Sequence, residues 1–167
     1  MPAQVSVCGP RHCTSEDEAN AFRVGQLLAE RGITVVCGGG SGVMAAVAAG
    51  VRSKNGQVIG VRPGDDPDDA SPDLSAVIVT NMGEARNAII VWSADAVIAI
   101  GGSWGTLSEV ALAMRRGGIP VVTLGGWRIS DQHGRPVAGL LEAHSPESAV
   151  EQALAGIELH PSRRRAP

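Results

Sequence analysis

The stretch Ala-Val-Ile-Ala-Ile-Gly-Gly-Ser-Trp-Gly-Thr-Leu-Ser-Glu, residues 96–109, contains a complete strand-to-helix unit. Residues 96–100 form a continuous apolar run, which is typical of a strand buried in a parallel sheet. A glycine-rich turn follows at 101–105, and residues 106–116 predict a helix that Gly117 ends. A strand that runs through a tight turn into a helix is the repeating unit of α/β folds.

The same alternation continues along the rest of the chain. Further strands are predicted at residues 4–8, 33–37, 57–61, 76–80 and 120–124. Further helices are predicted at residues 15–31, 43–52, 84–93 and 146–155. Apolar strands that alternate with helices predict an α/β fold with a single doubly wound parallel sheet and helices on both faces, which is Rossmann-like. We assign residues 1–160 to this Rossmann-like nucleotide-binding domain and residues 161–167 to a disordered tail.

Length and composition predict one folded domain and exclude several classes of function. The chain has 167 residues, of which 44% are hydrophobic and 19% charged, so it is too apolar for a disordered protein. Only 2% of the residues are aromatic and the net charge is −3, which argues against nucleic-acid binding. The most apolar stretch, residues 88–100, is interrupted by Asp95 and is shorter than the ~20 residues of a membrane helix. We therefore expect a cytoplasmic protein whose partners include neither a nucleic acid nor a membrane.

Glycine accounts for 22 of the 167 residues, about twice its usual share. Two glycine clusters, 38–42 and 101–105, follow predicted strands and open predicted helices. Ligands of doubly wound sheets bind beyond the carboxyl ends of the strands, where backbone N–H groups and a helix N-terminus attract anions. These turns could also be simple connections. As candidates for binding a phosphate or a nucleotide, we single out Gly39, Gly40, Ser41, Gly42, Gly102, Ser103, Gly105 and Thr106.

Arg86 and Glu109 are the candidates for chemistry at this edge. Arg86 precedes the second cluster by 15 residues and lies in the helix after the fourth predicted strand, where a guanidinium can hold a phosphate bidentately. Glu109 adds a carboxylate near the start of the next helix. Both residues could instead have purely structural roles. Thr106 and Glu109 have the spacing of a capping box, and Arg86 could pair with Glu84 or Glu109. Trp104 could stack on a base or pack within the turn.

Two further patterns carry less weight. Residues 40–45, Gly-Ser-Gly-Val-Met-Ala, satisfy the GxGxxA dinucleotide pattern, but the acid expected about 20 residues later falls in the proline-rich loop 63–69. An NAD-type protein is therefore only a third hypothesis. Cys8, His12 and Cys13 are close in sequence, but their spacing matches no standard zinc pattern, so we expect no metal site.

The glycine clusters and the two charged residues together resemble the Lonely Guy-type phosphoribohydrolases, also known as lysine decarboxylase-like proteins, whose hallmark is PGGxGTxxE. Residues 101–109 align with this motif without a gap, although Gly101 and Ser103 replace a proline and a glycine. Residues 38–44 resemble the family's GGGxxGLMG segment, and Arg86 falls where the family has its catalytic arginine. With these two replacements, the motif is more similar to that of the branch that contains the molybdenum cofactor carrier protein and uncharacterised bacterial proteins.

The resemblance implies two functions of different kinds. As a hydrolase, the protein would cleave the N-glycosidic bond of a nucleoside 5′-monophosphate, with Arg86 and Glu109 as catalytic residues and no required cofactor. As a member of the carrier branch, it would bind molybdenum cofactor (molybdopterin) or an AMP-like nucleotide without turnover. In either case the partner is a phosphorylated small molecule, and the resemblance implies a homodimer or a higher homo-oligomer.

Overall fold

The computed structural model describes residues 3–159, so the predicted tail at 161–167 lies outside the described residues. The strands are β1 (Gln4–Cys8), β2 (Thr34–Cys37), β3 (Val58–Arg62), β4 (Ala76–Val79), β5 (Ala96–Ile100), β6 (Val121–Leu124) and β7 (Leu140–Ala143). The helices are α1 (Ser15–Glu30), α2 (Val43–Arg52), the 3₁₀ turn η1 (Gly83–Arg86), α3 (Asn87–Ser93), α4 (Trp104–Arg116) and α5 (Pro146–Leu159).

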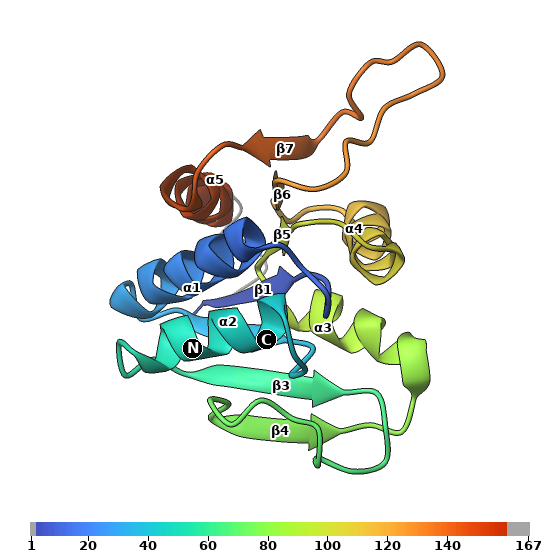
Figure 1. The fold of residues 1–167 in the computed structure, drawn as a ribbon. Helices are drawn as coiled ribbons and strands as arrows, with labels where there is room; N and C mark the ends of the chain where they lie inside the picture. The colour runs from blue at the N-terminus through green and yellow to red at the C-terminus, as the bar shows by residue number, and fades with distance from the viewer. Residues whose placement is uncertain (1–2, 160–167) are drawn as a thin grey trace, which may run out of the picture.

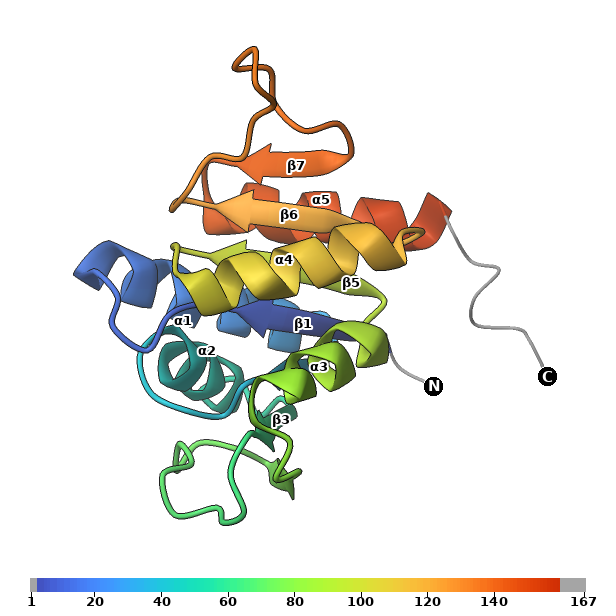
Figure 2. The same ribbon diagram turned by 90° about the vertical axis from the view of Figure 1, so that its right-hand side faces the viewer.

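All seven strands pair in parallel in one sheet of order β4-β3-β2-β1-β5-β6-β7. Helices α1, α2 and α5 cover one face of this sheet, and α3 and α4 cover the other (Figures 1 and 2). The doubly wound Rossmann-like fold predicted from the sequence is thereby confirmed. The direction of winding reverses between β1 and β5, which are paired neighbours. A reversal of this kind opens a crevice at the carboxyl ends of the two strands.

The strands are apolar on both sides because each face of the sheet carries its own core. Val5, Val7 and Ile98 belong to the core under α1, α2 and α5. Val97 and Ala99 belong to the core under α3 and α4. Alternate residues of a strand point to opposite faces, so a strand covered on both faces is largely apolar. The buried Ser6 is the exception in β1, and its hydroxyl donates a hydrogen bond to the carbonyl of Ile90 at 2.7 Å.

Strand β7 is the element that sequence analysis missed. The last strand predicted from sequence ends at residue 124; residues 125–136 are predicted to be irregular or a hairpin that turns at His133-Gly134, and no strand is predicted between them and the helix from residue 146. In the structure the chain makes a long excursion, closed by one antiparallel bridge between Ser130 and Pro136, and then adds β7 beside β6. This excursion projects from the sheet edge in both views (Figures 1 and 2). A four-residue edge strand with only Ala143 buried has no apolar run to reveal it.

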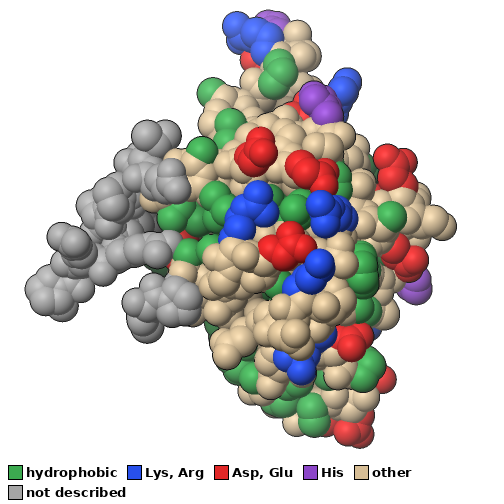
Figure 3. All heavy atoms as spheres, turned by 90° about the vertical axis from the view of Figure 1, so that its left-hand side faces the viewer, with side chains coloured by type: hydrophobic (Ala, Val, Ile, Leu, Met, Phe, Trp, Pro, Cys, Tyr) green, Lys and Arg blue, Asp and Glu red, His purple; other side chains and the backbone are tan. Residues whose placement is uncertain are grey.

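The outer face of α1, α2 and α5 is a mixed-charge surface. Cations and anions alternate across it without forming a patch of one sign (Figure 3). Arg23 pairs with Glu147 at 2.9 Å, and Lys54 pairs with Glu30 at 2.8 Å. These exposed pairs contribute little to stability, because water and salt screen their charges. The two apolar cores, and not these ion pairs, therefore hold the layers together.

Helices α1 and α2 pack unusually closely because glycines face each other's backbones. A Cβ built on Gly50 of α2 would overlap the carbonyl oxygen of Phe22. A Cβ on Gly25 of α1 would overlap the carbonyl oxygen of Val47. Backbone atoms cannot swing away as the end of a flexible side chain can, so neither position has room for a methyl group.

We therefore expect Gly50→Ala to destabilise the fold. Overpacking against backbone costs about 1–3 kcal/mol, which exceeds the gain in helix propensity of about 1 kcal/mol. The matched control is Gly64→Ala, because a Cβ on the exposed Gly64 meets nothing within 4 Å. Urea denaturation of both variants measures the effect. An unfolding free energy of Gly50→Ala equal to that of the control would contradict the close packing.

Candidate functional site

A cavity of about 320 Å³ lies at the carboxyl ends of the strands, where the winding reverses between β1 and β5. In Figure 2 this edge of the sheet faces left, beside the starts of α1 and α4. Its walls come from the loop after β1, the end of β2, the first turn of α2, the η1–α3 segment and the start of α4. The residues that line it are Cys8, Gly9, Pro10, Arg11, His12, Gly38, Met44, Glu84, Arg86, Asn87, Ser103, Gly105, Thr106 and Glu109.

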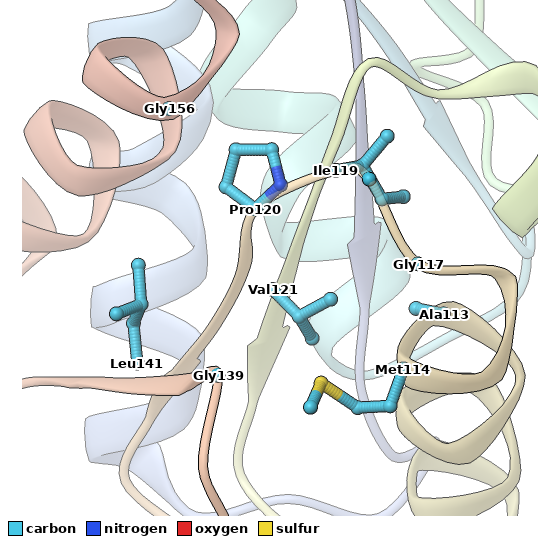
Figure 4. A pocket seen from close by; sticks show the side chains of 10 residues that line it. Ala113, Met114, Gly117, Ile119, Pro120, Val121, Gly139, Leu141 and Gly156 are labelled. Carbon is cyan, nitrogen blue, oxygen red and sulfur yellow. The ribbon is translucent and has the colours of Figure 1, made fainter. Parts of the chain in front are cut away.

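A second hollow, of about 350 Å³, lies at the opposite edge of the sheet. Figure 4 shows it between α4, α5 and the amino ends of β6 and β7, lined by Met114, Ile119, Pro120, Val121 and Leu141. No charged side chain lines it. A phosphorylated ligand needs donors or cations, so the cavity at the carboxyl edge is the better candidate site.

Helix α4 begins two residues earlier than predicted, so Glu109 is not part of the cap of this helix. Ser103 is the N-cap, and its Oγ accepts a hydrogen bond from the backbone N–H of Thr106 at 3.2 Å. The hydroxyl groups of these two residues also lie 2.9 Å apart. The alternative that Thr106 and Glu109 form the capping box is therefore wrong. Glu109 lies in the second turn, only 6% exposed, and lines the cavity.

The environment of Glu109 favours its protonated form. Burial raises the pKa of this carboxyl from 4.5 to about 7, while the charge of Arg86 and a hydrogen bond from the thiol of Cys8 lower it and the charge of Glu84 raises it further. Burial, followed by the charge of Glu109, also raises the pKa of Cys8 well above 9.0, so Cys8 stays a neutral thiol. A carboxyl group with a pKa near neutrality can both accept and return a proton.

Arg86 is buried without a direct partner. It is 9% exposed, and its Nε and Nη1 atoms form no hydrogen bond to any described residue. None of the ion pairs within residues 3–159 includes Arg86, so the alternative of a pair with Glu84 or Glu109 is wrong. Glu84 instead accepts a hydrogen bond from Asn87 at 3.3 Å.

Gly38 makes room for the Arg86 guanidinium. A Cβ at this position would lie 2.6 Å from Nη1 and 2.9 Å from Nη2 of Arg86. Only a residue without a side chain allows the guanidinium to lie against the end of β2. The glycine that follows β2 therefore makes room for an arginine from a different segment.

The predicted site residues divide into two groups. Those in the cavity wall are Arg86, Ser103, Gly105, Thr106 and Glu109. Those that do not line it are Gly39, Gly40, Ser41, Gly42 and Gly102. Their binding roles stay predictions.

The glycines outside the wall have packing contacts of their own. A Cβ on Gly102 would lie 2.7 Å from Cδ1 of Trp127, and one on Gly42 would overlap the carbonyl oxygen of Pro10. Trp104 is 78% exposed and meets Trp127 edge to face, with ring centroids 5.0 Å apart. This contact agrees with the alternative that Trp104 is a packing residue, and it lies on the surface of the protein and not in a core.

Arg11, His12 and Asn87 also line the cavity, although no sequence motif pointed to them. The first two lie in the loop after β1, and Asn87 opens α3. Only the strand order indicates these residues, because the loops that follow the two strands at the winding reversal form the crevice. Knowing the strand order would have pointed to the loop after β1.

Two negative findings apply to residues 3–159. Within them, no three His, Cys, Asp or Glu side chains are grouped so that they could hold a metal ion. None of the helices in this range has the length and apolar character needed to cross a membrane.

Comparisons with known protein sequences match most of the chain. The model of the SLOG cluster4 family matches residues 2–150. An uncharacterized protein of Archaeoglobus fulgidus is 44% identical over 115 residues, which cover 68% of this chain and 75% of that protein. The probable cytokinin riboside 5′-monophosphate phosphoribohydrolase LOGL5 of Oryza sativa subsp. japonica is 38% identical over 124 residues. That match covers 72% of this chain but only 46% of the rice protein.

Comparisons with solved structures match the whole architecture. The molybdenum cofactor binding protein of the phototrophic bacterium Rippkaea orientalis has a TM-score of 0.84 and 34% identity, covering 93% of this chain and 97% of that one. The molybdenum cofactor carrier protein of Chlamydomonas reinhardtii has a TM-score of 0.77 and 28% identity, covering 93% and 99%. Both similarities extend over nearly the full length of both chains.

The raised pKa of Glu109 predicts how stability depends on pH. The folded state binds this proton more tightly than the unfolded state, so the associated stability is fully present below pH 4.5 and lost as pH rises through about 7. Glu109→Gln carries no titrating carboxyl. We expect this variant to become more stable relative to the unmodified protein between about pH 5 and pH 8, by on the order of 3 kcal/mol.

Denaturant unfolding at a series of pH values measures this difference. The control is Glu151→Gln, which removes an exposed carboxyl on α5 and should follow the unmodified protein at every pH. Curves for Glu109→Gln and the unmodified protein that run parallel across this range would contradict the raised pKa.

Proposed function

The chain belongs to the SLOG cluster4 family and to the Lonely Guy-type superfamily that its motifs resemble, and on this basis we propose that it is a phosphoribohydrolase acting on a nucleoside 5′-monophosphate. The observation that carries the proposal is the buried Glu109 carboxyl, whose pKa of about 7 suits proton transfer, in one cavity with the unpaired guanidinium of Arg86. The resemblance to the superfamily motif supports the same two residues.

The start of α4 and Arg86 would hold the phosphate. Gly105 borders the cavity, and a Cβ there would meet nothing nearer than Ser103 Oγ at 3.8 Å. An anion can therefore approach the backbone N–H groups at this helix end, where the helix dipole favours negative charge. Arg86 supplies a permanent cation with free N–H donors on the same cavity.

Glu109 would act on the sugar carbon that carries the base. When the N-glycosidic bond breaks, its electron pair leaves with the base, and positive charge develops on the ribose. Glu109 takes a proton from the attacking water, whose oxygen bonds to C1′, and this proton passes to the departing base. Water and nucleotide thus give ribose 5-phosphate and free base. The pKa of about 7 lets the group serve in both directions.

A carrier function is the second candidate, and the similarity to the Rippkaea orientalis protein over 97% of its length favours it. Under this function the same cavity holds molybdopterin or a nucleotide, and no bond is broken. Gly101 and Ser103, which replace residues of the hydrolase motif, also support it. Mass spectrometry of the protein as purified identifies a retained ligand of either class. The expected homo-oligomer and the cytoplasmic location stay predictions, and light scattering tests the first of them.

If the protein is a hydrolase, it should release free base from AMP or from a cytokinin riboside monophosphate. Removing the proton-transfer group in Glu109→Gln should lower the rate at least ~100-fold, because general acid–base catalysis contributes about that much or more. Nucleotide affinity should change far less. Chromatographic detection of the base measures the rate, and Ser108→Ala on the exposed side of α4 is the control.

Two results would contradict hydrolysis. Full turnover by Glu109→Gln would remove Glu109 from the chemistry. A complete lack of turnover by the unmodified protein, with a ligand retained in its cavity, would instead support the carrier function.

Gly105→Ala separates binding from folding. The added methyl group meets no protein atom closer than 3.8 Å, and alanine in a helix is favoured over glycine by about 1 kcal/mol. We therefore expect an unchanged or higher Tm together with at least ~10-fold weaker AMP binding, since the methyl group occupies the space of the phosphate. Calorimetry measures the affinity, again beside Ser108→Ala. Unaltered AMP affinity would show that the phosphate binds elsewhere.

A further inference from the structure

A second buried arginine, Arg62, lies at the end of β3 and is not among the residues that line the cavity. It is 5% exposed, and its Nε and Nη1 atoms form no hydrogen bond to any described residue. Arginine keeps its charge when buried, unlike lysine or histidine. A buried cation without a partner is strongly unfavourable, so this position calls for an anion.

Arg62 and Arg11 both approach the first glycine cluster, residues 38–42, at Gly40. A Cβ at Gly40 would lie 3.2 Å from Nη1 of Arg62 and 3.6 Å from Nε of Arg11. It would also lie 3.1 Å from Cε of Met44. Arg11 lines the cavity as well, so it connects the space around Gly40 with the candidate site.

Met44 relates the two arginine positions to each other. Its Sδ atom borders Gly38 beside the Arg86 guanidinium, and its Cε atom borders Gly40 beside Arg62. The guanidinium groups of Arg86 and Arg62 therefore border the same glycine-rich loop, at Gly38 and Gly40, and the Met44 side chain borders both positions. Two anionic groups of one ligand could reach them together.

No described residue neutralises this set of cations. None of the ion pairs within residues 3–159 includes Arg11, Arg62 or Arg86. Glu109 lines the same cavity, but its own burial favours the neutral form. The adjacent helix α2 adds to the positive potential through its helix dipole, although the N–H of Val43 at its start donates a hydrogen bond to the carbonyl of Pro10 at 3.1 Å.

We propose that Arg62, Arg11 and the loop at Gly40 form a second anion subsite beside the phosphate site of the proposed function, so that the cavity binds a nucleoside 5′-diphosphate more tightly than the corresponding monophosphate. One phosphate lies between Arg86 and the start of α4, and the other lies between Arg62, Arg11 and the start of α2. The proposal rests on the proposed function in placing a nucleotide in the cavity, and it specifies the substrate class. It also gives Gly40 a role, since any side chain there would fill the subsite.

Calorimetry with four probes tests the subsite: AMP, ADP, inorganic phosphate and inorganic pyrophosphate. The unmodified protein should bind ADP at least ~10-fold tighter than AMP, and pyrophosphate at least ~10-fold tighter than phosphate. Arg62→Leu should reduce both ratios to within about threefold while AMP affinity stays nearly the same. Arg62→Lys should keep part of each ratio. Arg115→Leu, which removes an exposed arginine of α4, should keep both in full.

Thermal unfolding shows whether the variant folds. Arg62→Leu removes an unpaired buried charge, so its Tm without ligand should be at least that of the unmodified protein. Its rise in Tm on adding pyrophosphate should be smaller. A variant that folds but keeps the full pyrophosphate response would overturn the subsite.

The outcomes for the two proposals are distinct. If AMP is bound and cleaved but ADP binds no tighter, or if Arg62→Leu weakens AMP and ADP equally, the second subsite is overturned and the hydrolase stands. If no nucleotide is bound or cleaved while pyrophosphate binding depends on Arg62, the hydrolase is overturned and the anion subsite stands.

Discussion

The burial of Arg86 and Glu109 in one cavity, without a direct ion pair, is the constraint on which the site depends. A buried cation and a buried carboxyl both lose hydration, and direct pairing would repay part of that cost. Here Glu109 responds by favouring its neutral form, and Arg86 keeps its N–H donors free. Gly38 at the end of β2 admits the guanidinium, and the Ser103 cap leaves Glu109 clear of the helix end. The fold thus holds two groups ready for a ligand at the cost of some stability.

Much of the fold could be predicted from sequence because buried parallel strands leave clear signals. The apolar runs of β1 and β5 and the helix α2 match the structure residue for residue. The missed strand β7 is an exposed edge whose pairing depends on β6, so local sequence could not reveal it. The assignment of the helix start to Thr106 failed because a serine three residues earlier competes for the same cap.

Sequence alone predicted those residues of the candidate site that belong to a motif. It did not predict the residues that only the strand order brings to the site. Arg86 and Glu109 stand out through their spacing from the second glycine cluster, and both line the cavity. Arg11 and Arg62 carry no local pattern, since a single arginine at a strand end or in a loop usually faces solvent. Only the strand order brings them together around Gly40. The first glycine cluster consequently serves packing and arginine placement more than the lining of the cavity itself.

A hydrolase and a carrier would use the same cavity. They differ in whether the carboxyl of Glu109 faces C1′ of a bound ribose. A crystal structure of Glu109→Gln with AMP tests the account most directly, because a slowed variant retains an intact nucleotide. We predict the phosphate against Arg86 and the first turn of α4, with C1′ of the ribose facing the side chain at position 109. A nucleotide bound outside this cavity, or one whose ribose points away from position 109, would contradict the account.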